Sequence, residues 1–466
     1  MAAAFGTSGL RGRVEDLDPA TVARWVGAFL ASCATGGRVF VGRDLRASSP
    51  AIAAAVIDRL RRAGVEAVDC GACPTPVLAL AATGAGAIMV TGSHIPADRN
   101  GLKFYGMAGE ITKAEEAAMV RHADTDLPEA VNPGPLSTFD PAPPARARLR
   151  GAFGPEALSA LRIGVWQQSS VARDLLVEVL TDLGAQAVPF GRAGHFVAID
   201  TEAVTQDLRD WLAREARAGG FDAIVSTDGD GDRPLVADEV GRVIPGDILG
   251  LLCARALGAE RIVTTVTANS ALDVMAGQVD RVRIGSPHVI AGLAQILRQA
   301  PDARVLGFEP NGGVLLPVAL HGPAGRLSPL PTRDALLPIV AVLALRRAAE
   351  VPLGQLVAAL PVRATAADRL TEIDRAAGAA LLEALGGEGH LRADVLDGLP
   401  PVLSMDRTDG LRLTLDGGAV LHLRLSGNAP EFRVYTEAAT PEAAEALLAH
   451  GLRRVATLMA EEGGKW

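Results

Sequence analysis

The chain has 466 residues, of which 49% are hydrophobic and 21% are charged. This composition is typical of a folded protein rather than a disordered one, and the length is too great for one hydrophobic core, so we expect roughly three or four domains. The formal net charge of −9 excludes a dominant basic surface for nucleic acid, and it means that any site for an anionic substrate must be basic locally.

Four cysteines in a chain of this length do not form a disulfide framework. Cys70 and Cys73 have CxxC spacing, but no second pair completes a zinc site, and we interpret both as packing residues. The N-terminus lacks the apolar stretch of a signal peptide, and the apolar segment 246–258 is too short and too often interrupted to cross a bilayer. We therefore expect a cytoplasmic protein with no membrane partner.

A weak internal repeat organises most of the chain. Each copy opens with a β-rich run, at residues 38–44, 162–170 and 261–270, and continues through a helical pattern to a second strand. Each copy then reaches a strand–loop–strand segment, and the three loops are GSHIPADRNG, DGDGDR and EPNGG. Ligands gather at the carboxyl ends of strands in α/β sheets. We therefore predict three similar α/β domains with mixed sheets, whose loops line one cleft.

The end of the chain has a different pattern. After about residue 365 it becomes strand-rich, and a last helix begins at Thr440-Pro441-Glu442. We predict a smaller C-terminal α+β domain at the same cleft, and we interpret the proline-rich segment 128–144 as a connection. The expected domains are residues 1–150, 151–246, 247–365 and 366–466.

Three carboxylates alternate with glycines in the loop DGDGDR. Asp228, Asp230 and Asp232 can point toward one locus, and oxygen ligands of this kind suit Mg²⁺ or Ca²⁺. The loop lacks the distal glutamate of an EF-hand. A plain acidic turn is the weaker alternative, because clustered carboxylates between apolar strands need compensating charge. We predict a metal site, with Arg233 placed to touch a phosphate beside it.

The loop of the first repeat carries Ser93, with His94 beside it and Lys103 further on. A serine hydroxyl is a weak nucleophile unless a base or a metal activates it, and in isolation Ser93 could equally be a turn residue. Three aspartates, however, can leave one metal position open for a phosphoserine oxygen, and basic neighbours would suit the phosphorylated form. The combination favours Ser93 as the carrier of a phosphoryl group.

Two further loops carry groups suited to a sugar phosphate. The segment RLSGNAPEFRVY, residues 424–435, combines two arginines with Ser, Gly and Asn, as anion sites do; a hairpin with exposed arginines is the plainer alternative. Glu309 and Asn311 in GFEPNGG pair a carboxylate with an amide, which suits sugar hydroxyls, although an ordinary turn explains them nearly as well. The glycine-rich segment around Arg11 does not fit Walker A spacing.

In order, these segments resemble the signatures of the α-D-phosphohexomutase family, and the resemblance covers essentially the whole chain. The segments that carry it are FGTSGLRG, TGSHIPADRNGLKF, DGDGDR, GFEPNGG and RLSGNAPEFRVY. The serine, sugar and phosphate loops most resemble those of bacterial phosphomannomutases. Two positions depart from the commoner pattern: Ile95 stands where many members have Asn, and Asn428-Ala429 stands where Thr-Glu is commoner.

The resemblance implies a role for each loop. Ser93 would be phosphorylated and would join the three aspartates of DGDGDR around one Mg²⁺. Arg11, His94 and Lys103 would surround the phosphoserine and handle charge or protons. The implied substrate contacts are Arg233, His288, Glu309, Asn311, Arg424, Ser426, Gly427, Asn428 and Arg433. The four domains would thus carry the phosphoserine, metal, sugar and phosphate contacts in chain order.

The implied reaction, that of an isomerase, interconverts hexose 1- and 6-phosphates, with mannose the expected sugar. The enzyme would donate its phosphoryl group, a hexose 1,6-bisphosphate would turn over, and the opposite phosphate would return to the serine; the bisphosphate would also act as activator. Such transfer needs positioning and charge neutralisation, and a closing fourth domain would exclude water. We expect a monomer or homodimer.

Four alternatives stay open from the sequence. Specificity for glucose phosphate or for glucosamine phosphate would use the same loops. A metal-dependent sugar phosphatase is disfavoured because the phosphate loop is separate from the serine loop. A non-catalytic sugar-phosphate binder is disfavoured because the serine and all three aspartates are present.

Overall fold

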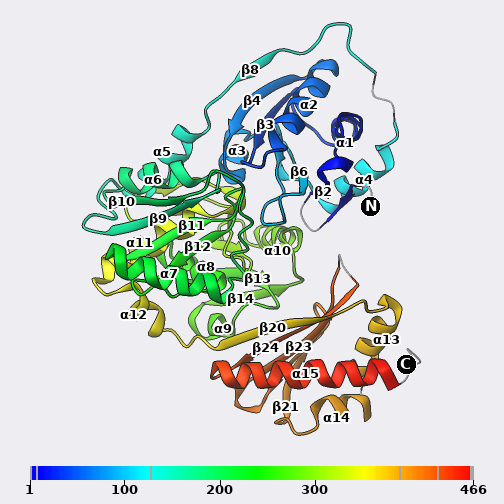
Figure 1. Ribbon diagram of the computed structural model, residues 1–466, viewed down its shortest axis with the longest axis vertical. Helices are drawn as coiled ribbons and strands as arrows, with labels where there is room; N and C mark the ends of the chain where they lie inside the picture. The colour runs from blue at the N-terminus through cyan, green and yellow to red at the C-terminus, as the bar shows by residue number, and fades with distance from the viewer. Residues whose placement is uncertain (1–2, 7–8, 126–127, 388–389, 428–429, 462–466) are drawn as a thin grey trace.

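The chain forms three α/β domains with mixed sheets and a C-terminal domain of one antiparallel sheet with helices (Figure 1). The computed structural model describes residues 3–6, 9–125, 128–387, 390–427 and 430–461. The fold class expected from the sequence is confirmed. In the described ranges, no helix has the length and apolar character needed to cross a membrane.

The first domain is built on the sheet β1-β2-β6-β5-β3-β4-β8, with β7 paired to β6. The central strand β3 runs parallel to β4 and β5, and β5 turns back antiparallel into β6. Its strands are Ala4–Phe5, Leu10–Arg13, Arg38–Arg43, Glu66–Ala72, Gly86–Val90, Arg99–Gly106, Gly109–Glu110 and Leu136–Thr138 (β1 to β8), and its helices are Pro19–Ser32, Ser49–Arg62, Thr75–Ala81 and Lys113–His122 (α1 to α4). Each face of the sheet has its own apolar cluster, and Cys70 and Cys73 are buried in one of them, as packing residues are.

The second and third domains repeat the pattern of parallel strands followed by an antiparallel hairpin. The sheet orders are β10-β9-β11-β12 and β14-β13-β15-β16-β19. The second domain contains α5 to α7 (Ala142–Phe153, Arg173–Asp182, Gln206–Gly219) and β9 to β12 (Arg162–Gln168, Gln186–Arg192, Ala223–Thr227, Pro234–Ala237). The third contains α8 to α12 (Gly246–Ala256, Ala271–Met275, Ser286–Gln299, Leu336–Ala349, Leu353–Ala358) and β13 to β19 (Arg261–Thr265, Gln278–Val282, Val305–Phe308, Val314–Leu316, Leu320–His321, Arg326–Leu327, Leu330–Asp334).

The C-terminal domain has the strand order β20-β24-β23-β22-β21, antiparallel throughout. Its strands β20 to β24 are Ala364–Thr371, Val402–Asp406, Leu411–Leu415, Val420–Leu425 and Glu431–Ala438, and its helices α13 to α15 are Arg375–Gly386, His390–Leu396 and Pro441–Glu461. Alternation along β23 sends leucines into the core beneath the helices and polar residues to the other face. Arg412, His422 and Tyr435 on that polar face line a hollow together with residues of the other three domains.

The three loops singled out in the sequence occupy equivalent places in the first three domains. They join the antiparallel pairs β5–β6, β11–β12 and β15–β16, each after a completely buried strand. Because the preceding strands are the inner, parallel strands of their sheets, all three loops leave at a carboxyl end, where ligands collect in such folds.

Candidate active site

One cleft of about 1480 Å³ is lined by residues of all four domains. From the first domain it takes Arg11, Ser93, His94 and Lys103, from the second Arg233, from the third Glu309 and Asn311, and from the fourth Gly427 and Arg433. The structure therefore brings most of the residues expected from the sequence to one place.

The serine loop holds Ser93 in an unusual conformation. The φ of Ser93 is +52°, in the left-handed region that residues other than glycine seldom adopt. Its Oγ donates a hydrogen bond of 2.5 Å to Oδ2 of Asp228, and it lies 3.3 Å from Nδ1 of His94. Burial and the charge of Arg233 lower the pKa of His94 to about 4, so this ring is neutral near pH 7.

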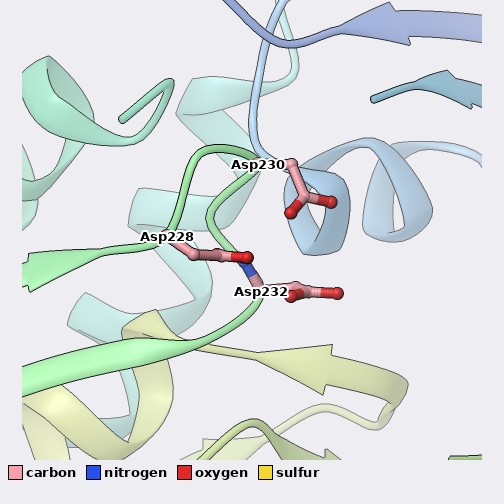
Figure 2. A group of neighbouring side chains, drawn as sticks. All are labelled: Asp228, Asp230 and Asp232. Carbon is pink, nitrogen blue, oxygen red and sulfur yellow. The ribbon is translucent and has the colours of Figure 1, made fainter. Parts of the chain in front are cut away.

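The three aspartates lie together on the turn between β11 and β12 (Figure 2). All are buried, and one carboxylate oxygen of each lies within 4.8 Å of the others. Burial, with the charges of Asp230 and Asp232, raises the pKa of Asp228 well above its ordinary range. Burial alone would also raise the pKa of Asp232, but Arg333 and Lys103 outweigh it and hold that pKa below its ordinary range.

Lys103 links the first domain to this turn. Its Nζ donates to Oδ2 of Asp230 and to Oδ2 of Asp232, both at 2.6 Å. The lysine side chain is only 4% exposed, so both contacts are made away from bulk water, where opposite charges attract strongly. Oδ1 of Asp230 and Oδ1 of Asp232 are buried with no hydrogen-bond partner among the described residues. Two unsatisfied buried carboxylate oxygens on one turn fit a divalent cation.

Arg11 and Arg233 bring positive charge to the same part of the cleft. Nη1 of Arg11 donates to the carbonyl oxygen of Thr91, which fixes the arginine beside the serine loop. Nε of Arg233 is buried without a hydrogen-bond partner in the described part of the chain, and its nearest carboxylates, on Asp232 and Glu202, lie 3.9 and 4.0 Å away. The Arg233 guanidinium is therefore available to an anion.

The sugar loop follows β15 and places Glu309 and Asn311 in the cleft wall. Both are buried, and Oδ1 of Asn311 accepts a hydrogen bond of 3.1 Å from the backbone N of Gly313. That bond holds the turn and leaves the amide NH₂ of Asn311 for other partners. Carboxylate and amide groups in this setting can bind hydroxyls.

The phosphate loop connects β23 to β24, two inner strands of the fourth domain's sheet. Gly427 and Arg433 line the cleft, and Arg433 also contacts Glu431 at 2.9 Å. Arg424 is buried and pairs with Asp409 at 3.3 Å, outside the cleft lining.

The remaining predicted contacts fall elsewhere. Ser426, the first residue after β23, is buried and is not among the residues that line the cleft. His288, in the first turn of α10, is outside the cleft lining, and burial lowers its pKa. Asn428 lies outside the described residues.

Comparison with known proteins gives matches along the whole chain. Models of the phosphoglucomutase/phosphomannomutase alpha/beta/alpha domains I, II and III match residues 2–128, 150–241 and 245–363. This chain belongs to the phosphoglucomutase/phosphomannomutase family. The resemblance drawn from the sequence motifs is thereby confirmed.

Individual members of the phosphoglucomutase/phosphomannomutase family align with nearly the full chain. A phosphomannomutase of Sinorhizobium fredii is 43% identical over 97% of this chain and 98% of its own length. A phosphomannomutase of Salmonella muenchen is 40% identical over 94% of this chain and 92% of its own. A solved structure of a family protein from Burkholderia thailandensis, 24% identical, covers 98% of both chains with a TM-score of 0.77, which supports the fold.

Two side chains that hold the site together, Arg333 and Thr75, lie outside the sequence motifs of this family member. Nη2 of Arg333, on β19, donates to Oδ2 of Asp232 at 2.8 Å, and Nη1 donates to Oε1 of Glu309 at 3.1 Å. Oγ1 of Thr75, at the start of α3, donates to Oδ2 of Asp230 at 2.6 Å. An arginine between apolar runs, as in LPTRDALL, was the available signal for Arg333.

Proposed function

We propose that the chain is a phosphomannomutase, an isomerase that interconverts mannose 1-phosphate and mannose 6-phosphate. Family membership and the two phosphomannomutases that are 43% and 40% identical support this proposal. The observation that carries it is the hydrogen bond of 2.5 Å from Ser93 to Asp228, because it joins a hydroxyl that lines the shared cleft to a metal-type carboxylate of the next domain. A separate basic loop in the fourth domain leaves room for a second phosphate.

One Mg²⁺ fits the turn of three aspartates, with the phosphorylated Ser93 as a further ligand. The two buried, unpartnered carboxylate oxygens of Asp230 and Asp232 support this assignment. The ion, when bound, would neutralise charge on the transferring phosphoryl group. Lys103 contributes positive charge at the same carboxylates, and Arg11 and Arg233 extend it into the cleft.

The reaction takes place in two halves. In the first, the bond from Ser93 Oγ to phosphorus breaks as O6 of mannose 1-phosphate bonds to phosphorus, and the proton of O6 ends on Ser93 Oγ. In the second, the 1,6-bisphosphate has turned end for end and returns its 1-phosphoryl group to Ser93, while the serine proton passes to O1. His94, whose Nδ1 lies 3.3 Å from Ser93 Oγ, can relay this proton.

The remaining groups keep the sugar phosphate in place during both halves. Glu309 and Asn311 bind sugar hydroxyls in either orientation, and the loop at Gly427 and Arg433 binds the phosphate that is not reacting. A chain that loses its phosphoryl group to water is rephosphorylated by free hexose 1,6-bisphosphate, which therefore acts as activator.

The test follows phosphorus during turnover. With Mg²⁺, mannose 1-phosphate and a trace of hexose 1,6-bisphosphate, phosphorus NMR is expected to show mannose 6-phosphate, and intact mass is expected to show one added phosphoryl group. Ser93→Ala loses both signals, whereas the control Ser137→Ala, at an exposed serine on β8, keeps them. If inorganic phosphate is the sole product, the protein is a phosphatase. If mannose 1-phosphate is not converted at all, the protein is a non-catalytic sugar-phosphate binder.

Sugar specificity is measured in the same assay. Mannose 1-phosphate is expected to give a higher kcat/KM than glucose 1-phosphate or glucosamine 1-phosphate. A higher value for either of the other two sugars would reassign the substrate while leaving the mutase chemistry in place.

A further inference from the structure

The side chain of Arg46 is completely buried beneath the serine loop. Its Nη1 donates to the carbonyl oxygens of Pro96 and Arg99, at 2.6 and 2.9 Å. Its Nη2 donates to the carbonyl oxygens of Ser93 and Ile95, at 2.8 and 2.6 Å. Four carbonyls of one loop therefore converge on one guanidinium, which has the planar set of donors needed to hold them together.

The fifth N–H of Arg46 extends this network to the backbone of the serine itself. Nε of Arg46 donates to Oδ2 of Asp44, and the same oxygen accepts from Oγ1 of Thr91 at 2.8 Å. Oγ1 of Thr91 in turn accepts from the backbone N of Ser93 at 2.7 Å. Both the N–H and the C=O of Ser93 are thus fixed by one buried network.

Such external support is needed because of the backbone conformation of Ser93. A φ of +52° is unfavourable for a non-glycine residue, and the surrounding structure must offset that strain. The preceding Gly92 leaves space for the support, since a Cβ there would lie 2.5 Å from Cζ of Arg46. The loop and the arginine therefore fit each other closely.

The second domain covers this arginine with Phe196. Cζ of Arg46 lies 4.0 Å from the centroid of the Phe196 ring, which is a cation–π distance. The same ring packs on Gly229 of the metal loop, where a Cβ would lie 2.8 Å from Phe196 and 2.8 Å from the carbonyl oxygen of Ser93. Phe196 thus contacts both the support of the serine loop and the metal loop.

We propose that Arg46 is a positioning residue for phosphoryl transfer. Phe196, which stacks on Arg46, would then set the position of Ser93 relative to Asp228. This inference rests on the proposed function of the cleft. Arg46 is not among the residues that line the cleft, and its side-chain hydrogen bonds in the described part of the chain go to Asp44 and to carbonyl oxygens of the serine loop; it acts by fixing the serine backbone. A lysine keeps the charge at this position but offers one donor group in place of a planar five-donor fork, so it cannot hold four carbonyls at once.

The test compares Arg46→Lys and Phe196→Ala with a matched control, Arg59→Lys, at another buried arginine of the first domain. Displacement of a reacting group by about 1 Å can lower a rate roughly 100-fold, so Arg46→Lys is expected to lower kcat by about that factor. KM for mannose 1-phosphate is expected to stay within about threefold, because Arg46 is outside the sugar and phosphate loops. Phe196→Ala is expected to lower kcat about tenfold.

A second readout separates positioning from simple structural support. The experiment starts from enzyme phosphorylated on Ser93 and measures the ratio of phosphoryl groups transferred to water to those transferred to the sugar phosphate. Arg46→Lys and Phe196→Ala are expected to increase the share lost to water, because a displaced serine no longer faces the sugar; Arg59→Lys is expected to behave as wild type. A loss of folding stability alone would not change this ratio.

Several outcomes decide the matter. A kcat within twofold of wild type and an unchanged ratio in Arg46→Lys would overturn the inference. If Arg46→Lys does not fold, Phe196→Ala, at a half-buried residue, decides by the same criteria. A wild-type chain with no mutase activity would instead refute the proposed function, which keeps the two failures distinguishable.

Discussion

Acidic and basic side chains lie close together around the metal loop. The carboxylates are Asp228, Asp230, Asp232 and Glu309, and the cations are Arg11, Lys103, Arg233 and Arg333. The chain as a whole carries −9, so these cations are gathered locally. A phosphoryl group on Ser93 adds about −2 beside three buried carboxyl groups, and such a charge is costly unless a cation enters with it.

Phosphorylation of Ser93 and Mg²⁺ binding are therefore expected to strengthen each other. We predict that the phosphorylated chain binds Mg²⁺ about tenfold more tightly than the unphosphorylated chain, within the usual range of coupling between two sites. Isothermal titration of Mg²⁺ into both forms measures the difference. Ser93→Ala serves as the control and should match the unphosphorylated form; equal affinities in the two forms would contradict the coupling between phosphorylation and Mg²⁺ binding.

Packing between a helix and a strand sets the place of the sugar loop. Gly250 on α8 faces the ring of Phe308, and a Cβ at this glycine would lie 2.4 Å from the ring. Phe308 ends β15 and directly precedes Glu309. A movement of this ring is therefore passed to the residue expected to bind sugar hydroxyls.

Gly250→Ala is expected to overpack this contact. Added atoms in a packed core usually cost about 1–3 kcal/mol, so we predict a lower melting temperature and a raised KM for mannose 1-phosphate. The control is Gly151→Ala on α5, where no atom lies within 4 Å of the new Cβ. At that position alanine has a better helix propensity than glycine, so the free energy of unfolding should increase by about 0.5–1 kcal/mol. A melting temperature for Gly250→Ala at or above that of wild type would show that Phe308 can move away freely.

The sequence predicts these loops well because each one directly follows an apolar strand along the chain. For that reason the serine loop with Ser93 and the metal loop with its three aspartates could be recognised as two motifs that act together. Arg46 and Arg333 could not, because their partners are distant in the sequence and depend on how the sheets and domains pack; Arg333 and Asp232 are 101 positions apart. For Arg424 the motif predicts a phosphate contact, which stays a prediction, while the structure adds its pairing with Asp409.

The four domains are joined in two different ways. The second and third share one continuous apolar core, in which Leu176 and Leu251 belong to the same cluster. The apolar core of the fourth domain is a separate cluster. Hydrogen bonds join it to the third domain in the described part of the chain: Glu437 Oε1 accepts one from the backbone N of Ser270 at 2.9 Å, and Asp409 Oδ2 accepts one from the backbone N of Ile284 at 3.0 Å. Small polar interfaces between domains permit relative motion.

The position of the fourth domain should therefore depend strongly on Glu437. Glu437→Ala removes a buried, charge-assisted hydrogen bond worth about 1.5–3 kcal/mol. We predict that KM for mannose 1-phosphate rises roughly tenfold, because the phosphate loop spends less time against the cleft, and that the radius of gyration in solution scattering increases. Asp397→Ala is the control, since Asp397 pairs with Arg454 within the fourth domain. A raised KM with an unchanged radius would mean that Glu437 acts on the substrate directly rather than through the domain's position.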